Sequence, residues 1–214
     1  TFVQSAASFE NESALLSQLD HPSIVDLLDF FIDGSSAYLV LEHLEGYTIR
    51  DYVAEHGVME KNKVLAVAEQ LCEVLEYLHG KEPPVVHRDF TPDNILIGED
   101  GAVKVIDFSV AEQKQSKKES DCAGKHAYTP PEQFRGDACP QSDVYALGGV
   151  MAYLLTGDDP EPLSQIKLGA DVDDRLRRIV ETATALELEE RYSSASWLKA
   201  EILDAAGVER EEPI

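Results

Sequence analysis

Residues 86–97 carry the most specific pattern in this chain, and they read Val86-His87-Arg88-Asp89-Phe90-Thr91-Pro92-Asp93-Asn94-Ile95-Leu96-Ile97. Thirteen residues after Asn94 comes a second short pattern, Asp107-Phe108-Ser109. Taken singly, Asp89 and Asn94 read as turn residues and Asp107 as a strand end, because Asp and Asn favour such positions. Together they predict three oxygen-bearing side chains on or beside short strands and a tight loop.

Three such side chains suit phosphoryl transfer. A carboxylate has to orient the attacking hydroxyl and accept its proton. Two further oxygen ligands have to hold Mg²⁺ against the nucleotide phosphates. The residue types and their spacing therefore favour a phosphotransferase site.

The same residues resemble the motifs of eukaryotic-like protein kinases, including those found in bacteria. His87-Arg88-Asp89 with Asn94 matches the catalytic-loop motif HRDxxxxN, and residues 107–109 match DFG except in the last residue. Pro130-Pro131-Glu132 matches APE with one change, and residues 142–148 resemble the start of the family's buried central helix. The resemblance runs from residue 9 to about residue 205.

The resemblance implies an α+β, protein-kinase-like fold of two lobes, with an incomplete small N-terminal lobe and a mainly helical C-terminal lobe. Residues 1–41 would form the partial small lobe from a helix and two strands, residues 42–47 the hinge, and residues 48–214 the large lobe. Hydrophobic periodicity separately predicts a helix over residues 60–80. A second, apolar helix is expected to be capped by Ser142 or Asp143.

Carried over to this chain, the family's catalytic roles fall on five residues. Asp89 would orient the substrate hydroxyl and take its proton, while Asn94 and Asp107 would ligate Mg²⁺ beside ATP. Arg88 would meet a phosphate on the activation segment, since Arg binds phosphate bidentately. Glu12 stands where the family has the glutamate of its αC helix.

The adenine of ATP would be bound at the hinge. Leu41 precedes this segment, and the backbone of Glu42-His43-Leu44 would meet the adenine ring. Leu96 would pack under the purine.

Three further residues have structural roles in the family. Asp143 would hold the catalytic loop by accepting hydrogen bonds from its backbone amides. Glu132 and Arg191 would form an ion pair, the alternative being two plain surface charges.

The N-terminal residues depart from the family. Residues 1–40 contain one glycine, Gly34, and therefore no GxGxxG loop, and they contain no lysine of the VAIK type. Glu12 consequently has no visible partner. Either an upstream segment supplies both elements, which the absence of an initiator Met favours, or the fold is degraded.

Two substitutions near the catalytic loop look reciprocal. Thr91 stands where Ser/Thr kinases usually carry lysine, and Lys125 stands where they usually carry threonine. We expect the ammonium group of Lys125 to replace the missing one below the γ-phosphate, the alternative being a solvent-facing lysine.

The polar stretch between Asp107 and Glu132 would be the activation segment. It contains Ser116 and Ser120, and the resemblance predicts autophosphorylation at one of them because a hydroxyl here would lie near Arg88. A merely solvated loop is the alternative.

Composition excludes several classes of function. The net charge of −23 argues against a nucleic-acid or anionic-membrane surface, both of which need clustered Lys and Arg. Three cysteines without a CxxC pair indicate neither a disulfide framework nor a zinc site, and they suggest a reduced, cytoplasmic location. No stretch is apolar for long enough to span a membrane, and nothing predicts an oligomeric state.

The function expected from the resemblance is an ATP- and Mg²⁺-dependent protein kinase acting on Ser/Thr hydroxyls of protein substrates. One alternative is a pseudokinase that serves as a binding or scaffold module, which the missing glycine loop and lysine favour. Another is a small-molecule phosphotransferase of the aminoglycoside type, which the Pro-Pro-Glu motif disfavours.

Overall fold

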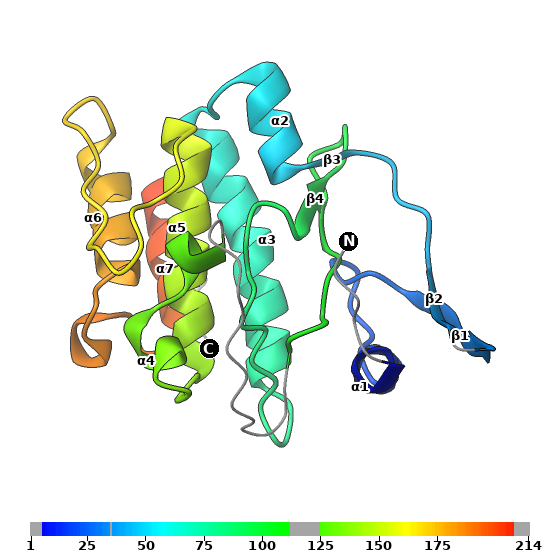
Figure 1. The fold of residues 1–214 in the computed structure, drawn as a ribbon. Helices are drawn as coiled ribbons and strands as arrows, with labels where there is room; N and C mark the ends of the chain where they lie inside the picture. The colour runs from blue at the N-terminus through cyan, green and yellow to red at the C-terminus, as the bar shows by residue number, and fades with distance from the viewer. Residues whose placement is uncertain (1–5, 35, 112–124, 208–214) are drawn as a thin grey trace, which may run out of the picture.

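The structure is a computed structural model that describes residues 6–34, 36–111 and 125–207. Figure 1 shows helix α1 (Ala6–Leu16) and the hairpin of β1 (Leu27–Asp33) and β2 (Ser36–Leu41) on one side of the molecule, with the longer helices packed together on the other. A small sheet lies between these two parts (Figure 1). The order of elements agrees with the α+β class predicted from the sequence.

The hairpin is antiparallel and pairs Phe31 with Tyr38, whose rings stack with centroids 5.0 Å apart. Gly34 adopts a positive φ of 59° in the turn, a conformation that glycine reaches without steric cost. Leu15 and Leu16 of α1 are buried in the core.

The small sheet joins the two parts of the molecule. Its strands β3 (Tyr47–Thr48), β4 (Ile95–Ile97) and β5 (Val103–Val105) are antiparallel and lie in that order. Val105 also exchanges backbone hydrogen bonds with the N-terminal part, donating to the Ser23 oxygen at 2.9 Å and accepting from the Val25 nitrogen at 3.0 Å. Strand β3 starts at Tyr47, inside the range 42–47 predicted for the hinge.

The helical body forms around α3 (Lys61–His79) and α5 (Pro140–Thr156). The apolar residues whose periodicity predicted α3, among them Val64, Leu71 and Leu78, are buried, and every residue of α5 from Ser142 to Leu154 is buried as well. Gly148 lets α5 approach its neighbour, since a Cβ there would lie 2.7 Å from the Thr184 side chain. The remaining helical elements are α2 (Ile49–His56), η1 (Lys125–Tyr128), α4 (Pro131–Phe134), α6 (Asp174–Ala183), η2 (Leu188–Glu190) and α7 (Ala195–Ala206).

The predicted start of α5 is wrong. The N-cap is Cys139, and Pro140 occupies the first turn, where its fixed φ suits a helix and its missing N–H costs nothing. Ser142 lies in the first turn and accepts from the Cys139 N–H at 3.1 Å, which closes a capping box. Asp143 is free for another role because it does not cap the helix. Among the described residues, no helix is both long and apolar enough to cross a membrane.

Candidate functional site

The loop before β4 joins Asp89 to Asn94. The Asn94 amide donates from Nδ2 to the Asp89 carboxylate at 2.8 Å and to the Asp89 backbone oxygen at 2.9 Å. The Asn94 N–H also donates to the Thr91 oxygen at 3.0 Å, which closes the turn between them. Both side chains are buried. The carboxylate therefore has a fixed orientation, and the amide Oδ1 is the Asn94 atom suited to ligate a cation.

Asp107 reaches the same end of the sheet from the neighbouring strand. It follows β5, while Asn94 precedes β4, and these strands are antiparallel with Ile95 opposite Val105. The N–H of Ile106 donates to the Asn94 backbone oxygen at 3.0 Å. The structure thus places Asn94 and Asp107 at one edge of the sheet, as a shared cation would require.

The donor set at this edge fits Mg²⁺, which takes one or two protein oxygens and completes its shell with phosphate and water. An amide oxygen from Asn94 and a carboxylate from Asp107 are ligands of this kind. Among the described residues, no group of three or more His, Cys, Asp or Glu side chains is placed to hold a metal by itself.

Asp143 of α5 holds the start of the loop that carries Asp89. Its fully buried carboxylate accepts from the backbone N–H groups of His87 at 2.8 Å and Arg88 at 2.9 Å, and it lies 2.9 Å from Nε2 of His79. Arg88 has a positive φ of 70°, which a residue with a side chain adopts only under constraint. The predicted role of Asp143 is confirmed.

Glu132 and Arg191 form a buried ion pair. Nη1 of Arg191 lies 2.7 Å from Oε1 of Glu132, and Ser142 donates from Oγ to the same oxygen at 2.8 Å. The predicted pair is confirmed, and the alternative of two surface charges is wrong.

Glu12 of α1 contacts the Asp107-Phe108-Ser109 motif. Its buried carboxylate accepts from the N–H of Phe108 at 3.4 Å. Burial, and then the nearby Asp107 carboxylate, raise the pKa of Glu12 to about 7. In the described part of the chain, no Lys or Arg forms an ion pair with Glu12.

We expect Glu12→Gln to stabilise the protein above pH 7 and to change little at pH 4.5. A carboxyl whose folded pKa is raised binds more protons folded than unfolded, so stability falls as pH rises from 4.5 to about 7. A glutamine stays neutral and escapes this loss. The measurement is the melting temperature of both proteins at pH 4.5 and at about pH 8. Glu10→Gln, on an exposed position of the same helix, is the control. An equal shift at both pH values for Glu12→Gln would contradict this reading.

Comparison of this sequence with known proteins identifies the family to which the chain belongs. The family described as "Protein kinase domain" matches residues 3–205. The chain belongs to the protein kinase domain family. It is 32% identical over 94% of its length to serine/threonine-protein kinase PrkC of Bacillus subtilis, and 33% identical over 91% of its length to serine/threonine-protein kinase PknB of Mycobacterium leprae.

This kinase domain spans about a third of the length of those relatives, 34% of PrkC and 35% of PknB. The predicted family and the two-lobe α+β fold with a reduced small lobe are confirmed.

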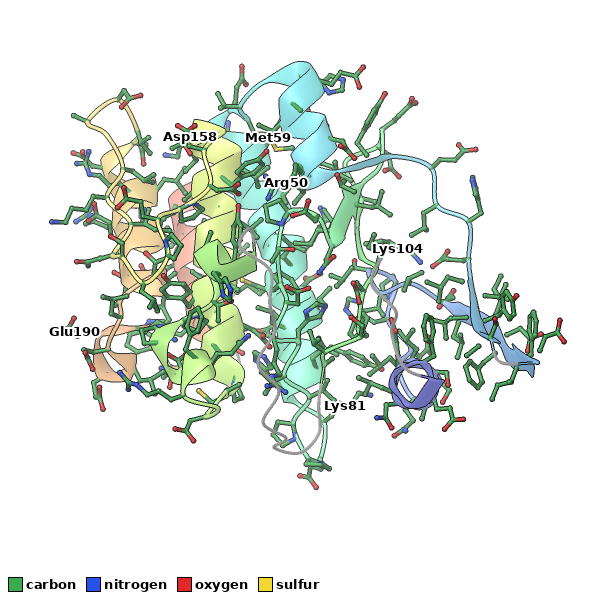
Figure 2. All side chains as sticks on the ribbon, in the orientation of Figure 1. Arg50, Met59, Lys81, Lys104, Asp158 and Glu190 are labelled. Atoms are coloured by element: carbon green, nitrogen blue, oxygen red, sulfur yellow. The ribbon has the colours of Figure 1, made fainter. Side chains whose placement is uncertain are left out.

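The segment predicted to be the hinge, residues 42–47, contains one partner of an ion pair that the sequence analysis missed. The Glu42 carboxylate accepts from the Asp26 N–H at 2.9 Å and pairs with Lys104 of β5, which Figure 2 labels. Lys104 alternates with the buried Val103 and Val105, so period-two alternation alone places its side chain on the opposite face of the strand.

The other residues predicted for the adenine site lie at the end of β2, in the segment that follows it, and in β4. Leu41, Leu44 and Leu96 are partly buried, and His43 is exposed. Lys125 begins η1, but its side chain lies outside the described part of the structure, as do Ser116 and Ser120.

Proposed function

We propose that this domain is an ATP- and Mg²⁺-dependent protein kinase that transfers the γ-phosphoryl group to Ser/Thr hydroxyls of protein substrates. The observation that carries the proposal is the hydrogen bond from the Asn94 amide to the Asp89 carboxylate, in a loop clamped by Asp143. The names of PrkC and PknB support the same activity class.

The proposed reaction uses Asp89 as the proton acceptor. The Asn94 amide fixes the orientation of the Asp89 carboxylate, which would orient the substrate hydroxyl and take its proton. The hydroxyl oxygen bonds to the γ-phosphorus as the bond to the β–γ bridging oxygen breaks, and ADP leaves. Asn94 and Asp107 would hold Mg²⁺, which neutralises the charge that develops on the phosphates.

The remaining predicted residues would complete this site. The backbone of Glu42, His43 and Leu44 would bind adenine, with Leu41 and Leu96 packing against it. Lys125 would supply the cation that Thr91 cannot, and Arg88 would bind a phosphate on the activation segment. The cytoplasmic location suggested by the cysteine count stays a prediction.

One observation favours a second candidate function, a pseudokinase that binds partners without phosphotransfer. Glu12 has no cationic partner among the described residues. Its carboxylate lies instead beside Asp107 and the Phe108 amide.

A thermal-shift experiment with Mg²⁺ and ATP tests the cofactor site. At about 100 times the dissociation constant, a ligand adds roughly 2.7 kcal/mol of stability. For a domain of this size, each kcal/mol raises the melting temperature by about 2–4 °C. We expect this Mg²⁺-dependent shift in the wild type and its loss in Asp107→Asn, which keeps the shape of the side chain but removes its charge.

Asp137→Asn, on an exposed residue away from the sheet edge, is the matched control and should keep the shift. A parallel assay of γ-phosphate transfer to myelin basic protein separates the two functions. Binding without transfer would favour the scaffold, and an unchanged shift in Asp107→Asn would contradict the cation site.

A further inference from the structure

Arg50 ties the start of α2 to the loop that carries Asp89. Its guanidinium forms a two-pronged ion pair with Asp93, with Nε 2.7 Å from Oδ1 and Nη2 3.0 Å from Oδ2. The Arg50 N–H donates to the Pro92 oxygen at 3.2 Å. Figure 2 labels Arg50 at the end of α2 that follows β3. The side chain and the backbone of one residue thus both contact the catalytic loop.

The same guanidinium binds a second carboxylate, on the segment after α5. Nη2 lies 3.0 Å from Oδ1 of Asp159, and Nη1 lies 3.3 Å from Oδ2. The guanidinium carbon also lies 4.9 Å from the centre of the Tyr153 ring, within cation–π range. One positive charge is therefore shared by two carboxylates from different parts of the large lobe.

Asp159 also contacts Tyr128, which lies near the end of the predicted activation segment. Its Oδ1 accepts a hydrogen bond from the Tyr128 hydroxyl at 2.6 Å. Burial, and then the Asp159 carboxylate, raise the pKa of Tyr128, so the hydroxyl stays protonated and keeps donating. The Tyr128 ring is buried against Gly149 of α5, where a Cβ would lie 3.0 Å from it. Tyr128 consequently has one position, set by α5 and by Asp159.

We propose that Arg50 is a positioning residue for the phosphoryl transfer proposed above. It holds Asp93 of the catalytic loop and, through Asp159, Tyr128 of the activation segment at a fixed separation. The protein hydroxyl to be phosphorylated then meets Asp89 in one geometry. The inference rests on the proposed function for its catalytic consequence, but not for the coupling between the two loops.

The exposure of the network separates positioning from simple stabilisation. The exposed fraction of the side chain is 29% for Arg50, 50% for Asp93 and 43% for Asp159. Ion pairs this exposed contribute little to folding stability. Misplacing a reacting group by about 1 Å, in contrast, costs up to about 100-fold in rate. A large kinetic effect with a small stability effect is therefore the signature of positioning.

The first test is Arg50→Gln, assayed with myelin basic protein as the acceptor. We expect kcat/KM for the acceptor to fall by about 10-fold or more, while KM for Mg-ATP changes less than about twofold. Arg50→Lys should recover only part of the loss, because it keeps the charge but not the forked geometry. Lys61→Gln, which breaks an exposed pair with Asp173 elsewhere, is the matched control and should leave both constants unchanged.

A double-mutant cycle tests whether Arg50 acts through Tyr128. If it does, Arg50→Gln combined with Tyr128→Phe is no worse than the more damaging single variant. Multiplying losses would overturn the proposal, and so would an equal loss in Lys61→Gln or a drop in melting temperature that accounts for the rate.

Hydrogen exchange gives a readout that does not need activity. In Arg50→Gln, the amides of residues 87–94 and 126–134 should both exchange faster, while those of residues 61–79 keep the wild-type rate. If the wild type transfers no phosphate, the proposed function fails, and exchange alone decides the coupling. Faster exchange in one of the two loops without the other would overturn it.

Discussion

Asp89→Asn is expected to lower phosphotransfer by about 100- to 10,000-fold, the range typical for removal of a general base. The asparagine oxygen can still accept the hydrogen bond from Asn94 Nδ2, so the loop keeps its shape. Its amide cannot accept the hydroxyl proton. Because Asp89 is not a proposed metal ligand, the Mg-ATP thermal shift should be retained. The measurement is the initial rate of γ-phosphate transfer to myelin basic protein.

Asp137→Asn removes an exposed carboxylate of the same lobe and should keep the wild-type rate. A rate for Asp89→Asn within about tenfold of wild type would show that another group takes the proton.

Arg191→Ala is expected to cost about 3–5 kcal/mol of folding stability, the usual result of removing one partner of a buried ion pair. The guanidinium is fully buried, and it donates to Glu132 and to the backbone oxygens of Gln141, Ala185 and Leu186. Truncation leaves the Glu132 carboxylate buried, with Ser142 as its remaining side-chain donor among the described residues. At about 2–4 °C for each kcal/mol, calorimetry should show a fall of roughly 6–20 °C.

Arg177→Ala is the control, because Arg177 pairs with an Asp174 that keeps 81% of its side-chain exposure. It should shift stability by about 0.5 kcal/mol or less. Replacing both Arg191 and Glu132 by methionine should cost less than Arg191→Ala, since no buried charge remains. Equal melting temperatures for Arg191→Ala and Arg177→Ala would refute the structural role.

The resemblance predicted the contacts whose partners both occupy positions to which the family assigns a structural role. Asp143 and Glu132 each lie in a recognisable pattern, so their bonds to the catalytic loop and to Arg191 followed from the resemblance. The long amphipathic helix α3 was predictable for a different reason, because its buried stripe repeats at the helical period over residues 61–79.

Contacts made by side chains outside the motifs were not predictable in this way. Arg50 lies 43 residues from Asp93 and 109 from Asp159, and nothing in its local pattern distinguishes it from a solvated helix residue. Lys104 and Glu42 are likewise distant in the sequence, 62 residues apart, and neither belongs to a motif. The start of α5 was missed because the hydroxyl of Ser142 and the carboxylate of Asp143 outrank a cysteine as expected caps.

An experimental structure of the protein with Mg²⁺ and a non-hydrolysable ATP analogue tests the central claim most directly. The account predicts a cation about 2.0–2.1 Å from Oδ1 of Asn94 and from a carboxylate oxygen of Asp107. The terminal phosphate should lie beside the Asp89 carboxylate. A cation bound by neither side chain, or a nucleotide seated away from this edge of the sheet, would contradict it.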